Sequence, residues 1–361
     1  MNCRRNIIII LFLFFLISIA TIYSTSIYLD DKYILLKQLI FYLLGFIIIF
    51  ILRNKKQNKI IKLAPIIYII TNTLLLLVLI IGKEINGAKA WFIIPKLGAF
   101  QPSEFMKIGL ILLLSQELDK YNKKDKTNIK TDFIFIIKET IIVLIPSILT
   151  FLEPDTGAVI MYLVIYTTIL YLSKINKRWF YTIFIILFLL IISLTLLYFF
   201  KQDLFIKILG SNILYRLDRI FDWLNGKGMQ LENSMISIGS AKTLGNGIKQ
   251  ILIYYPYPAT DFIFASYTTT FGLLGSIILI ALIIIFNLNL IKLAQKEEKS
   301  ISKYIIIVTI TLLMYQQTQN ISMTIGLLPI TGITLPFISY GGSSLISNMI
   351  LIGIILIKKM H

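Results

Sequence analysis

The sequence predicts an all-α fold, a polytopic integral membrane protein in which about ten hydrophobic helices cross the bilayer. The first reason is composition, because a chain of 361 residues that is 57% hydrophobic and 15% charged could not hide its apolar side chains in one aqueous core. The second reason is that isoleucine- and leucine-rich runs recur roughly every twenty to thirty residues, each long enough to span the hydrocarbon region as a helix. The third is that basic residues gather in alternate connecting segments.

The spans are expected near residues 7–28, 34–52, 61–81, 103–118, 133–151, 157–173, 179–200, 262–290, 304–322 and 343–357. Together they form a single transmembrane domain over residues 1–361, with a long extracytoplasmic segment at about 201–260 between the seventh and eighth helices. Arg4 and Arg5 before an apolar run are also typical of a cleavable signal peptide. No small-x-small cleavage site closes this run convincingly, so we interpret it as the first membrane anchor.

The orientation follows from the charged segments between the spans. Lys and Arg are concentrated at residues 53–62, 120–130, 174–178 and 292–303. The positive-inside rule places these segments, and with them the N and C termini, in the cytoplasm. The other segments, which hold most of the Gly and Pro residues, then lie on the outer face at residues 82–102, 153–157, 201–260 and 323–342. We expect the chemistry there, because loops held by a rigid bundle bring polar groups to a substrate.

Composition also excludes several classes of function. The chain has one cysteine, Cys3, and one histidine, His361, which excludes a disulfide framework, a Cys/His zinc site and an internal histidine acting as a general base. The net charge of +17 is spread over short segments between hydrophobic spans rather than over one basic domain. The charge therefore indicates membrane topology, and nucleic acid is not expected as a partner.

Asp261 is the first candidate for chemistry, and it has two interpretations. It follows Thr260 and precedes a long apolar span, so Thr260 could cap the helix while Asp261 interacts with the helix dipole. Alternatively, Asp261 is a carboxylate at the outer edge of the membrane, where partial desolvation raises its pKa and lets it act as a general base. The local sequence favours the two interpretations about equally.

Glu104 and Lys107 are the second candidates. They are three residues apart at the start of the fourth span, so they share one face of the helix and can form an ion pair. One interpretation is a structural pair in which each charge offsets the burial of the other. The other is a polar cavity within the membrane, where charged residues mark the path of a ligand.

The remaining outer segments contribute further candidates. Asp155 lies in a tight turn between two spans, where turn formation and helix capping are the simpler explanation. Arg216, Arg219 and Lys242 accompany several glycines, which suits an anionic ligand such as a pyrophosphate, although a flexible charged loop is the simpler alternative. The run from Leu335 to Ser344 interrupts the apolar pattern before the last span and suggests a re-entrant segment.

Taken together, these segments resemble the SEDS family of shape, elongation, division and sporulation proteins, whose best-known members are RodA and FtsW. Six blocks in the same order carry the resemblance: Gly87-Ala-Lys-Ala-Trp91, Phe100-Gln-Pro-Ser-Glu104 with Lys107, Glu153-Pro-Asp-Thr-Gly157, Ile238-Gly-Ser240, Thr260-Asp-Phe-Ile-Phe-Ala265, and Gly326 to Gly332 running into Leu335 to Ser344. They extend over most of the chain. One block would be a weak signal, whereas six in order are highly specific.

The resemblance implies a glycosyltransferase of the bacterial cytoplasmic membrane that polymerises lipid II, beside a class B penicillin-binding protein of the elongation machinery. It implies that Asp261 is the catalytic carboxylate. It further implies substrate contacts, which we assign to Lys89, Glu104, Lys107, Asp155, Arg216, Arg219, Lys242, Ser339 and Tyr340. A divalent cation, Mg²⁺ or Mn²⁺, would help the basic residues to stabilise the leaving pyrophosphate. The resemblance does not identify residues that would hold this metal.

The chain also departs from the family pattern. The family's Pro-Glu-x-His is replaced by Pro256-Tyr-Pro-Ala259, and its usual Glu-Glu pair is replaced by Thr269-Thr270. These departures bear on whether the activity, the metal use and the partner contacts of this chain follow the pattern typical of the family. The segment from Gly326 to Gly332 lacks the lysine of the FtsW version, so the chain is more similar to RodA.

Two other functions remain open from the sequence. A lipid II flippase would use a bundle with polar intramembrane residues, but it needs polar groups along the whole path, whereas this sequence gathers them on the outer face. A non-catalytic scaffold for the partner synthase is compatible with the altered residues around Asp261. An activity assay separates these alternatives.

Overall fold

The computed structural model describes residues 3–29, 31–85, 87–95, 98–123, 129–209, 221, 223–225, 228–251 and 253–357. The expected spans correspond to α1 (Cys3–Thr25), α2 (Ile34–Arg53), α4 (Ala64–Ile81), α5 (Pro102–Asn122), α6 (Ile129–Leu152), α7 (Thr156–Ser173), α8 (Lys177–Phe200), α12 (Ile263–Gln295), α13 (Ser300–Thr324) and α14 (Gly342–Ile355). Shorter helices are η1 (Ser26–Tyr28), α3 (Gln57–Lys62), α9 (Gln202–Leu209) and α11 (Met229–Ser240). A polytopic helical fold is therefore confirmed.

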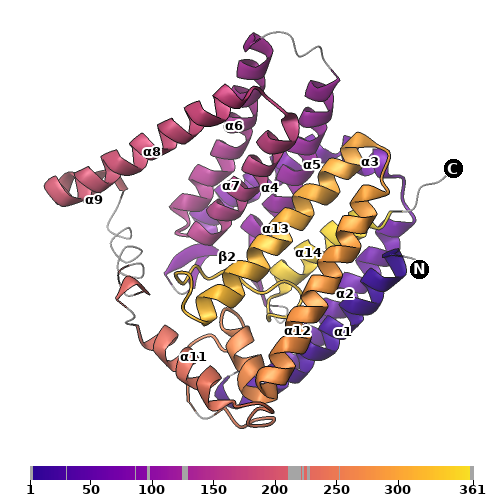
Figure 1. The fold of residues 1–361 in the computed structure, drawn as a ribbon, viewed down its shortest axis with the longest axis vertical. Helices are drawn as coiled ribbons and strands as arrows, with labels where there is room; N and C mark the ends of the chain where they lie inside the picture. The colour runs from indigo at the N-terminus through magenta and orange to yellow at the C-terminus, as the bar shows by residue number, and fades with distance from the viewer. Residues whose placement is uncertain are drawn as a thin grey trace.

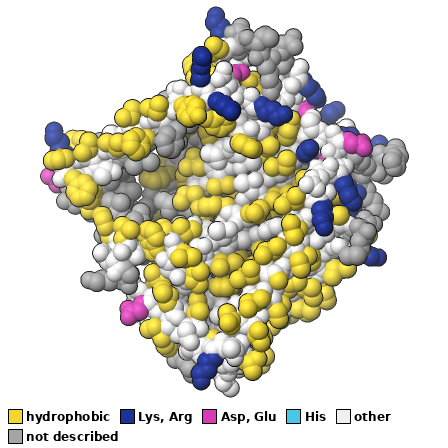
Figure 2. Space-filling model, viewed as in Figure 1, with side chains coloured by type: hydrophobic (Ala, Val, Ile, Leu, Met, Phe, Trp, Pro, Cys, Tyr) yellow, Lys and Arg dark blue, Asp and Glu magenta, His cyan; other side chains and the backbone are white. Residues whose placement is uncertain are grey.

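The helices differ in how strongly they favour lipid. Within the described residues, 6 helices are long and apolar enough to cross a membrane, and α14 is a shorter apolar helix. By contrast, α5 and α13 contain many buried polar residues, which lowers their hydropathy. Figure 2 shows hydrophobic side chains over the helical surface, with Lys and Arg near the edges of the face. The number of ten crossings remains a prediction.

Two apolar clusters hold the bundle together. One is formed mainly by α1, α2, α12 and α14, and the other mainly by α4, α5, α6 and α7. Helix α13 contributes to both clusters and lies between the two groups of helices (Figure 1). Helices α8 and α9 extend away from the rest of the bundle in the same view (Figure 1).

Contacts distant in sequence define the two ends of the bundle. At one end, Asp119 accepts a hydrogen bond from Ser300, and Asn122 Nδ2 donates to Tyr304 Oη at 2.8 Å. At the other end, the Gln101 amide donates to Ser343 Oγ at 2.9 Å. The expected cytoplasmic segments thus meet at one end and the expected outer segments at the other. Which end faces the cytoplasm remains a prediction from the positive-inside rule.

A sharp break interrupts α12 at Gly272, where a single span over 262–290 was expected. Gly272 has φ 72° and ψ −169°, a conformation that favours glycine. The hydroxyls of Thr268 and Ser276 are 2.8 Å apart, whereas residues eight apart in a straight helix are separated by about 12 Å along its axis. The stretch from Ile263 to Phe271 therefore turns back at Gly272, and Asp261 lies just before this short stretch.

The outer loop at residues 242–247 binds the backbone groups that the break leaves free. Four hydrogen bonds join them: Asn246 N to Thr269 O (2.9 Å), Gly247 N to Thr270 O (3.2 Å), Leu273 N to Lys242 O (3.1 Å) and Leu274 N to Thr243 O (3.1 Å). A Cβ on either Gly245 or Gly272 would approach the backbone of the other segment to 2.3 Å. Only glycine fits this contact without movement of the chain.

The outer segment before α5 forms a small sheet that the all-α prediction does not include. Its strands are β1 (Lys83–Ile85), β2 (Ala88–Ile94) and β3 (Gly98–Phe100), antiparallel in the order β1-β2-β3. Phe92 pairs with Phe100 across β2 and β3. Aromatic and β-branched residues favour such cross-strand pairs, which explains why this short segment forms strands rather than a helix.

Candidate active site

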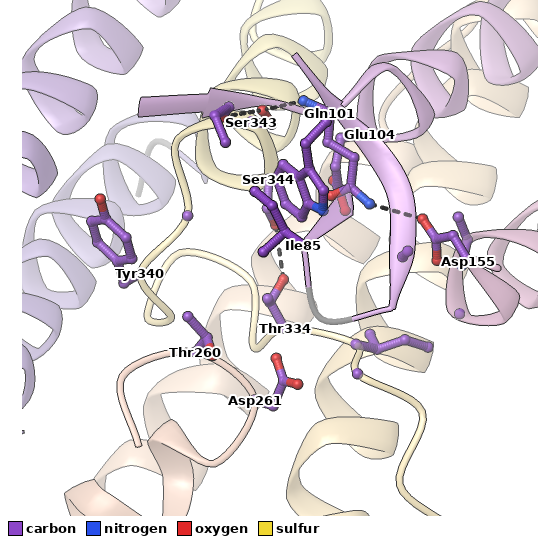
Figure 3. Close-up of a pocket in the computed structure, with 18 of the residues that line it drawn as sticks. Ile85, Gln101, Glu104, Asp155, Thr260, Asp261, Thr334, Tyr340, Ser343 and Ser344 are labelled. Atoms are coloured by element: carbon purple, nitrogen blue, oxygen red, sulfur yellow. Dashed lines mark hydrogen bonds between the residues drawn. The ribbon is translucent and has the colours of Figure 1, made fainter. Parts of the chain in front are cut away.

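A cavity of about 440 Å³ opens among the outer segments. Helices, the sheet and three outer loops all contribute to its wall. Its lining includes Phe41, Ile85, Ala88, Trp91, Gln101, Glu104, Asp155, Met161, Tyr257, Thr260, Asp261, Gln316, Thr331, Gly332, Thr334, Tyr340, Ser343 and Ser344. Figure 3 shows Asp261 on one side of this cavity and Gln101, Glu104 and Asp155 away from it on the other. The cavity therefore brings together residues from most of the matching sequence blocks.

Asp261 is held by its backbone while its carboxylate lines the cavity. Its carbonyl accepts a hydrogen bond of 2.8 Å from Asn320 Nδ2, and the same amide nitrogen donates at 2.8 Å to the carbonyl of Ile333. A Cβ placed on Gly332 would lie 3.7 Å from Asp261 Oδ2, so this glycine leaves room beside the carboxylate. Asn320 thus joins the two loops that form this wall.

The structure does not support the helix-capping interpretation of Thr260. Helix α12 begins at Ile263, its N-cap residue is Phe262, and no side chain caps it. Thr260 Oγ1 instead donates to the carbonyl of Tyr257 at 3.5 Å. Asp261 lies one residue before the N-cap, where its carboxylate is directed to the cavity (Figure 3).

The loop at residues 335–341 supports the Asp261 segment from a second side. Ser339 Oγ donates to the carbonyl of Thr260 at 2.7 Å, and the amide of Tyr340 donates to the carbonyl of Ala259 at 2.8 Å. Ser339 is buried and is not part of the described cavity lining, so a substrate contact at Ser339 remains a prediction. Tyr340 does line the cavity, and burial raises the pKa of its hydroxyl to about 12.

The predicted ion pair between Glu104 and Lys107 is confirmed. Lys107 Nζ lies 2.5 Å from Glu104 Oε2, and the lysine side chain is fully buried. Ser347 Oγ also donates to Glu104 Oε2, at 3.2 Å. Glu104 lines the cavity, whereas Lys107 lies behind it. The pair is therefore structural, and Glu104 also contributes to the wall of a polar cavity, while the path of a ligand remains a prediction.

Asp155 combines helix capping with a place in the cavity wall. One oxygen accepts from the Ala158 amide at 3.0 Å and so caps α7. The other accepts from Gln101 Nε2 at 2.8 Å and from Ser103 Oγ at 3.0 Å. Burial raises the pKa of Asp155, although the hydrogen bonds from Ala158 and Ser103 oppose this shift.

The described lysines that were predicted to bind substrate do not line the cavity. Lys89 Nζ donates to the carbonyl of Ile80 at 3.0 Å, and Lys242 is exposed beside the break in α12. Arg216 and Arg219 lie outside the described residues. Among the described residues that line the cavity there is no Lys or Arg, whereas Glu104, Asp155 and Asp261 are all present. The described lining thus includes three carboxylates, of which Glu104 is paired with Lys107.

Neutral hydroxyl pairs occupy the positions of the family's acidic pair. Thr269 Oγ1 lies 2.8 Å from Ser237 Oγ, and Thr270 Oγ1 lies 2.9 Å from Ser24 Oγ. All four side chains are buried, so each hydroxyl satisfies another. These contacts join α12 to α11 and α1, so the departure in sequence leaves the packing of the outer segment intact.

The described residues do not by themselves form a complete site for a divalent cation. They contain no group of three or more His, Cys, Asp or Glu side chains that could hold a metal ion. Mg²⁺ and Mn²⁺ favour several oxygen ligands, and these are commonly carboxylates. We therefore derive no step through a metal.

Sequence reasoning did not identify Asn320, Gln101 or Tyr257 as site residues. A signal for Asn320 was present, because Gln316, Gln317, Gln319 and Asn320 place four amides within the end of an apolar span. Polar side chains within a membrane span are costly unless they have partners, so such a cluster indicates a site. Gln101 and Tyr257 gave no comparable local signal.

Comparisons with known proteins agree with this arrangement. The model of a family of cell cycle proteins, FtsW/RodA/SpoVE, matches residues 3–361. The "Probable peptidoglycan glycosyltransferase FtsW" of Buchnera aphidicola subsp. Schizaphis graminum is 32% identical, over 91% of this chain and 91% of the relative. The "Peptidoglycan glycosyltransferase MrdB" of Helicobacter pylori is 30% identical, over 94% of this chain and 87% of the relative.

Two solved structures share the fold. The crystal structure of Thermus thermophilus rod shape determining protein RodA has a TM-score of 0.68 and 23% identity, and the match covers 97% of this chain and 94% of that chain. A chain from the structure "Structural coordination of polymerization and crosslinking by a peptidoglycan synthase complex" has a TM-score of 0.78 and 24% identity, over 97% of this chain and 95% of that chain. The helical arrangement is thus the same along nearly the whole chain.

Proposed function

Because the chain belongs to the FtsW/RodA/SpoVE family of cell cycle proteins, we propose that it is a peptidoglycan glycosyltransferase that polymerises lipid II on the outer face of the cytoplasmic membrane. The observation that carries this proposal is the position of Asp261, whose carboxylate lines a polar cavity while Asn320 and Ser339 hold its backbone segment. A catalytic base needs both access to substrate and a fixed position.

In the proposed reaction, Asp261 acts as the general base. Its carboxylate takes the proton from the 4-hydroxyl of one sugar while that oxygen attacks the anomeric carbon of another. The bond from the anomeric carbon to the lipid pyrophosphate breaks, and the pyrophosphate leaves with the electron pair. Gln101, Glu104 and Asp155 supply hydrogen-bonding groups to the sugars, because they line the opposite wall.

The distribution of polar groups favours a polymerase over a flippase. The cavity reaches Glu104 on α5 and Gln316 on α13. Further along the same helices, residues 110–114 and Leu312 belong to one buried apolar cluster. A flippase needs a polar path through the whole bilayer, whereas here the polar groups of the described cavity stop at this cluster.

A bacterial cytoplasmic membrane and a class B penicillin-binding protein complete the proposal. The chain is a multi-pass membrane protein, and the positive-inside rule predicts from its basic segments that the cavity lies outside. A structural relative comes from a complex that couples polymerization to crosslinking, which supports a crosslinking partner here. The RodA-like role in cell elongation rests on the missing lysine between Gly326 and Gly332.

Purified protein, with and without its partner, tests the proposal by conversion of lipid II to a glycan ladder. We expect Asp261→Asn to lower polymerisation per folded molecule by about two to four orders of magnitude, the loss typical of removing a general base. Partner binding and folding should persist, because Asn keeps the shape of Asp. Near-equal product from Asp261→Asn and wild type would move the scaffold or flippase functions ahead, and a translocation assay in vesicles would separate those two.

A further inference from the structure

Gln316 on α13 has a buried amide oxygen without a hydrogen-bond donor. The residue is fully buried, and it lines the cavity that contains Asp261. Its Nε2 donates to the sulfur of Met161 at 3.1 Å. Its Oε1 accepts no hydrogen bond from any residue that the structure describes. A buried carbonyl oxygen without a donor is unfavourable, so its presence in a cavity wall requires an explanation.

The position of Gln316 connects it to Asp261. Asn320, whose amide donates to the carbonyl of Asp261 at 2.8 Å, follows Gln316 by four residues on the same helix. Residues four apart in an α-helix share one face and are about 6 Å apart along the axis. Gln316 therefore lies one turn further than Asn320 from the end of α13 at Thr324. A substrate group that extends past Asp261 into the bundle would reach it.

Thr331 adds a second unpartnered polar atom to the same wall. Its Oγ1 is buried, has no partner within the described part of the chain, and belongs to a residue that lines the cavity. A Cβ on Gly157 would lie 2.9 Å from the carbonyl oxygen of Thr331, and Met161 follows Gly157 by one turn of α7. Because Met161 contacts the amide of Gln316, Thr331 and Gln316 are neighbours along one face of α7.

Access to the amide of Gln316 depends on a flexible neighbour. Because Gln316 is fully buried, a ligand contacts its oxygen only when an adjacent side chain moves. Met161 touches this amide and also lines the cavity. Methionine is unbranched and has three rotatable side-chain bonds, so it adapts to a ligand at low cost.

The hydrogen-bonding capacity of these groups restricts the chemistry of the ligand. The amide oxygen of Gln316 only accepts hydrogen bonds and therefore needs a donor, whereas the hydroxyl of Thr331 can donate or accept. An ionised phosphate offers acceptor oxygens and would not satisfy the oxygen of Gln316. A hydroxyl or an acetamido group on a sugar offers a donor hydrogen and an acceptor oxygen together.

We propose that Gln316 is a specificity-determining residue whose Oε1 accepts a hydrogen bond from a hydroxyl or acetamido substituent of the sugar at Asp261. This proposal rests on the proposed glycosyltransferase function and adds to it a residue that recognises the substrate. Met161 moves aside to admit the substituent, and the hydroxyl of Thr331 donates to its acceptor oxygen. The amide oxygen of Gln316 is then satisfied only when substrate is bound.

Gln316→Met tests the amide and keeps a side chain of similar length. The assay measures the initial rate of lipid II polymerisation by the purified full chain with its partner. We expect KM for lipid II to rise about 5- to 100-fold, because a buried donor of the substrate loses its acceptor, with kcat within about threefold. The melting temperature without substrate should stay the same or rise, since the variant removes an unsatisfied buried oxygen.

Gln317→Met is the matched control at the next position of α13. Gln317 is also buried, but its Oε1 accepts from Asn287 Nδ2 at 2.7 Å, and it is not part of the described cavity lining. This variant leaves the amide of Asn287 without its acceptor. It should lower the melting temperature and leave KM within about twofold of wild type.

Analogues of lipid II identify the substituent that Gln316 binds. In one series a single sugar hydroxyl is replaced by hydrogen, and in another compound an acetate ester replaces an acetamido group and so removes its N–H. The analogue without the relevant donor should raise KM with wild type and have little further effect on Gln316→Met, as in a double-mutant cycle. If every analogue affects the two proteins equally, Gln316 does not bind the sugar and the proposal is wrong.

The outcomes separate this proposal from the proposed function. A wild-type protein that forms no glycan ladder would remove the glycosyltransferase function, and this proposal with it. An active wild type with an unchanged KM in Gln316→Met would overturn only the role of Gln316. If that variant also melts at a lower temperature, a bound water satisfies the oxygen as part of the fold. A loss of kcat at unchanged KM would overturn the proposal too, because Gln316 would then act on the position of Asp261.

Discussion

Replacing Asn320 with leucine tests how Asp261 is positioned. One amide nitrogen donates to the carbonyls of Asp261 and Ile333, both at 2.8 Å, and the side chain is fully buried on α13. Leucine keeps the approximate volume and removes both hydrogen bonds. The buried carbonyl of Ile333 then loses a donor, which costs on the order of 1–3 kcal/mol, and the partly buried carbonyl of Asp261 loses a donor at a lower cost because water can replace it.

The expected result of Asn320→Leu is a loss in kcat that exceeds the loss of folded protein. The two loops of the cavity wall would no longer be joined, and a displacement of a catalytic group by about 1 Å can lower the rate roughly 100-fold. We therefore expect kcat per folded molecule to fall about 30- to 100-fold with a smaller change in KM. Detergent-solubilised protein, quantified by size-exclusion chromatography, provides the folded fraction, and lipid II polymerisation provides the rate.

A matched control makes this test specific. Asn287 is also a buried asparagine on a membrane helix, and it donates to Gln317 Oε1 at 2.7 Å rather than to a loop of the cavity. Asn287→Leu should lower thermal stability without lowering the rate per folded molecule. The positioning argument fails if Asn320→Leu and Asn287→Leu retain the same activity per folded molecule.

Two further predictions concern buried charges. Glu104→Gln should leave the buried ammonium of Lys107 without its partner and destabilise the fold by about 3–5 kcal/mol. The double variant with Lys107→Met should recover part of this loss. If Glu104→Gln and Lys107→Met each unfold at the wild-type temperature, the pair is unimportant. Burial, with a smaller contribution from Asp155, raises the pKa of Glu153 from 4.5 to about 9. Between these pH values the folded protein keeps a proton on Glu153 that the unfolded chain releases. The contribution of Glu153 to the free energy of unfolding therefore falls as the pH rises from 4.5 to about 9. Glu153→Gln should therefore raise the melting temperature more at pH 8 than at pH 5, and an equal shift at both pH values would contradict the buried, protonated state.

Much of the fold could be predicted because lipid imposes a simple length rule on helices. The expected span at residues 34–52 corresponds to α2 (Ile34–Arg53), and the span at 157–173 corresponds to α7 (Thr156–Ser173). The break at Gly272 was not predicted, because the groups that stabilise it come from residues 242–247. The strand pairing at residues 83–100 was not predicted for a different reason, because the long apolar spans dominated the hydropathy pattern.

The candidate site was predictable where a motif fixed the residue and its neighbourhood together. Asp155, Glu104 and Asp261 all belong to motif blocks, and all three line the cavity. Lys89 also belongs to a block, yet its ammonium bonds to the backbone at Ile80. The direction of a long lysine side chain depends on acceptors that lie nearby only in the folded chain. Sequence spacing therefore located the loops of the site better than the ends of its side chains.

The departures from the family pattern bear on whether this chain is an enzyme or a scaffold. A scaffold has no need of a fixed carboxylate, and burying an amide such as Asn320 is unfavourable unless its hydrogen bonds hold something in place. Here Asn320 holds Asp261, Ser339 holds Thr260, and the amide of Tyr340 holds Ala259. The altered positions at Thr269 and Thr270 are satisfied by neutral partners and do not disturb these contacts. Because these three contacts hold the backbone on either side of Asp261, the structure favours an enzyme over a non-catalytic scaffold.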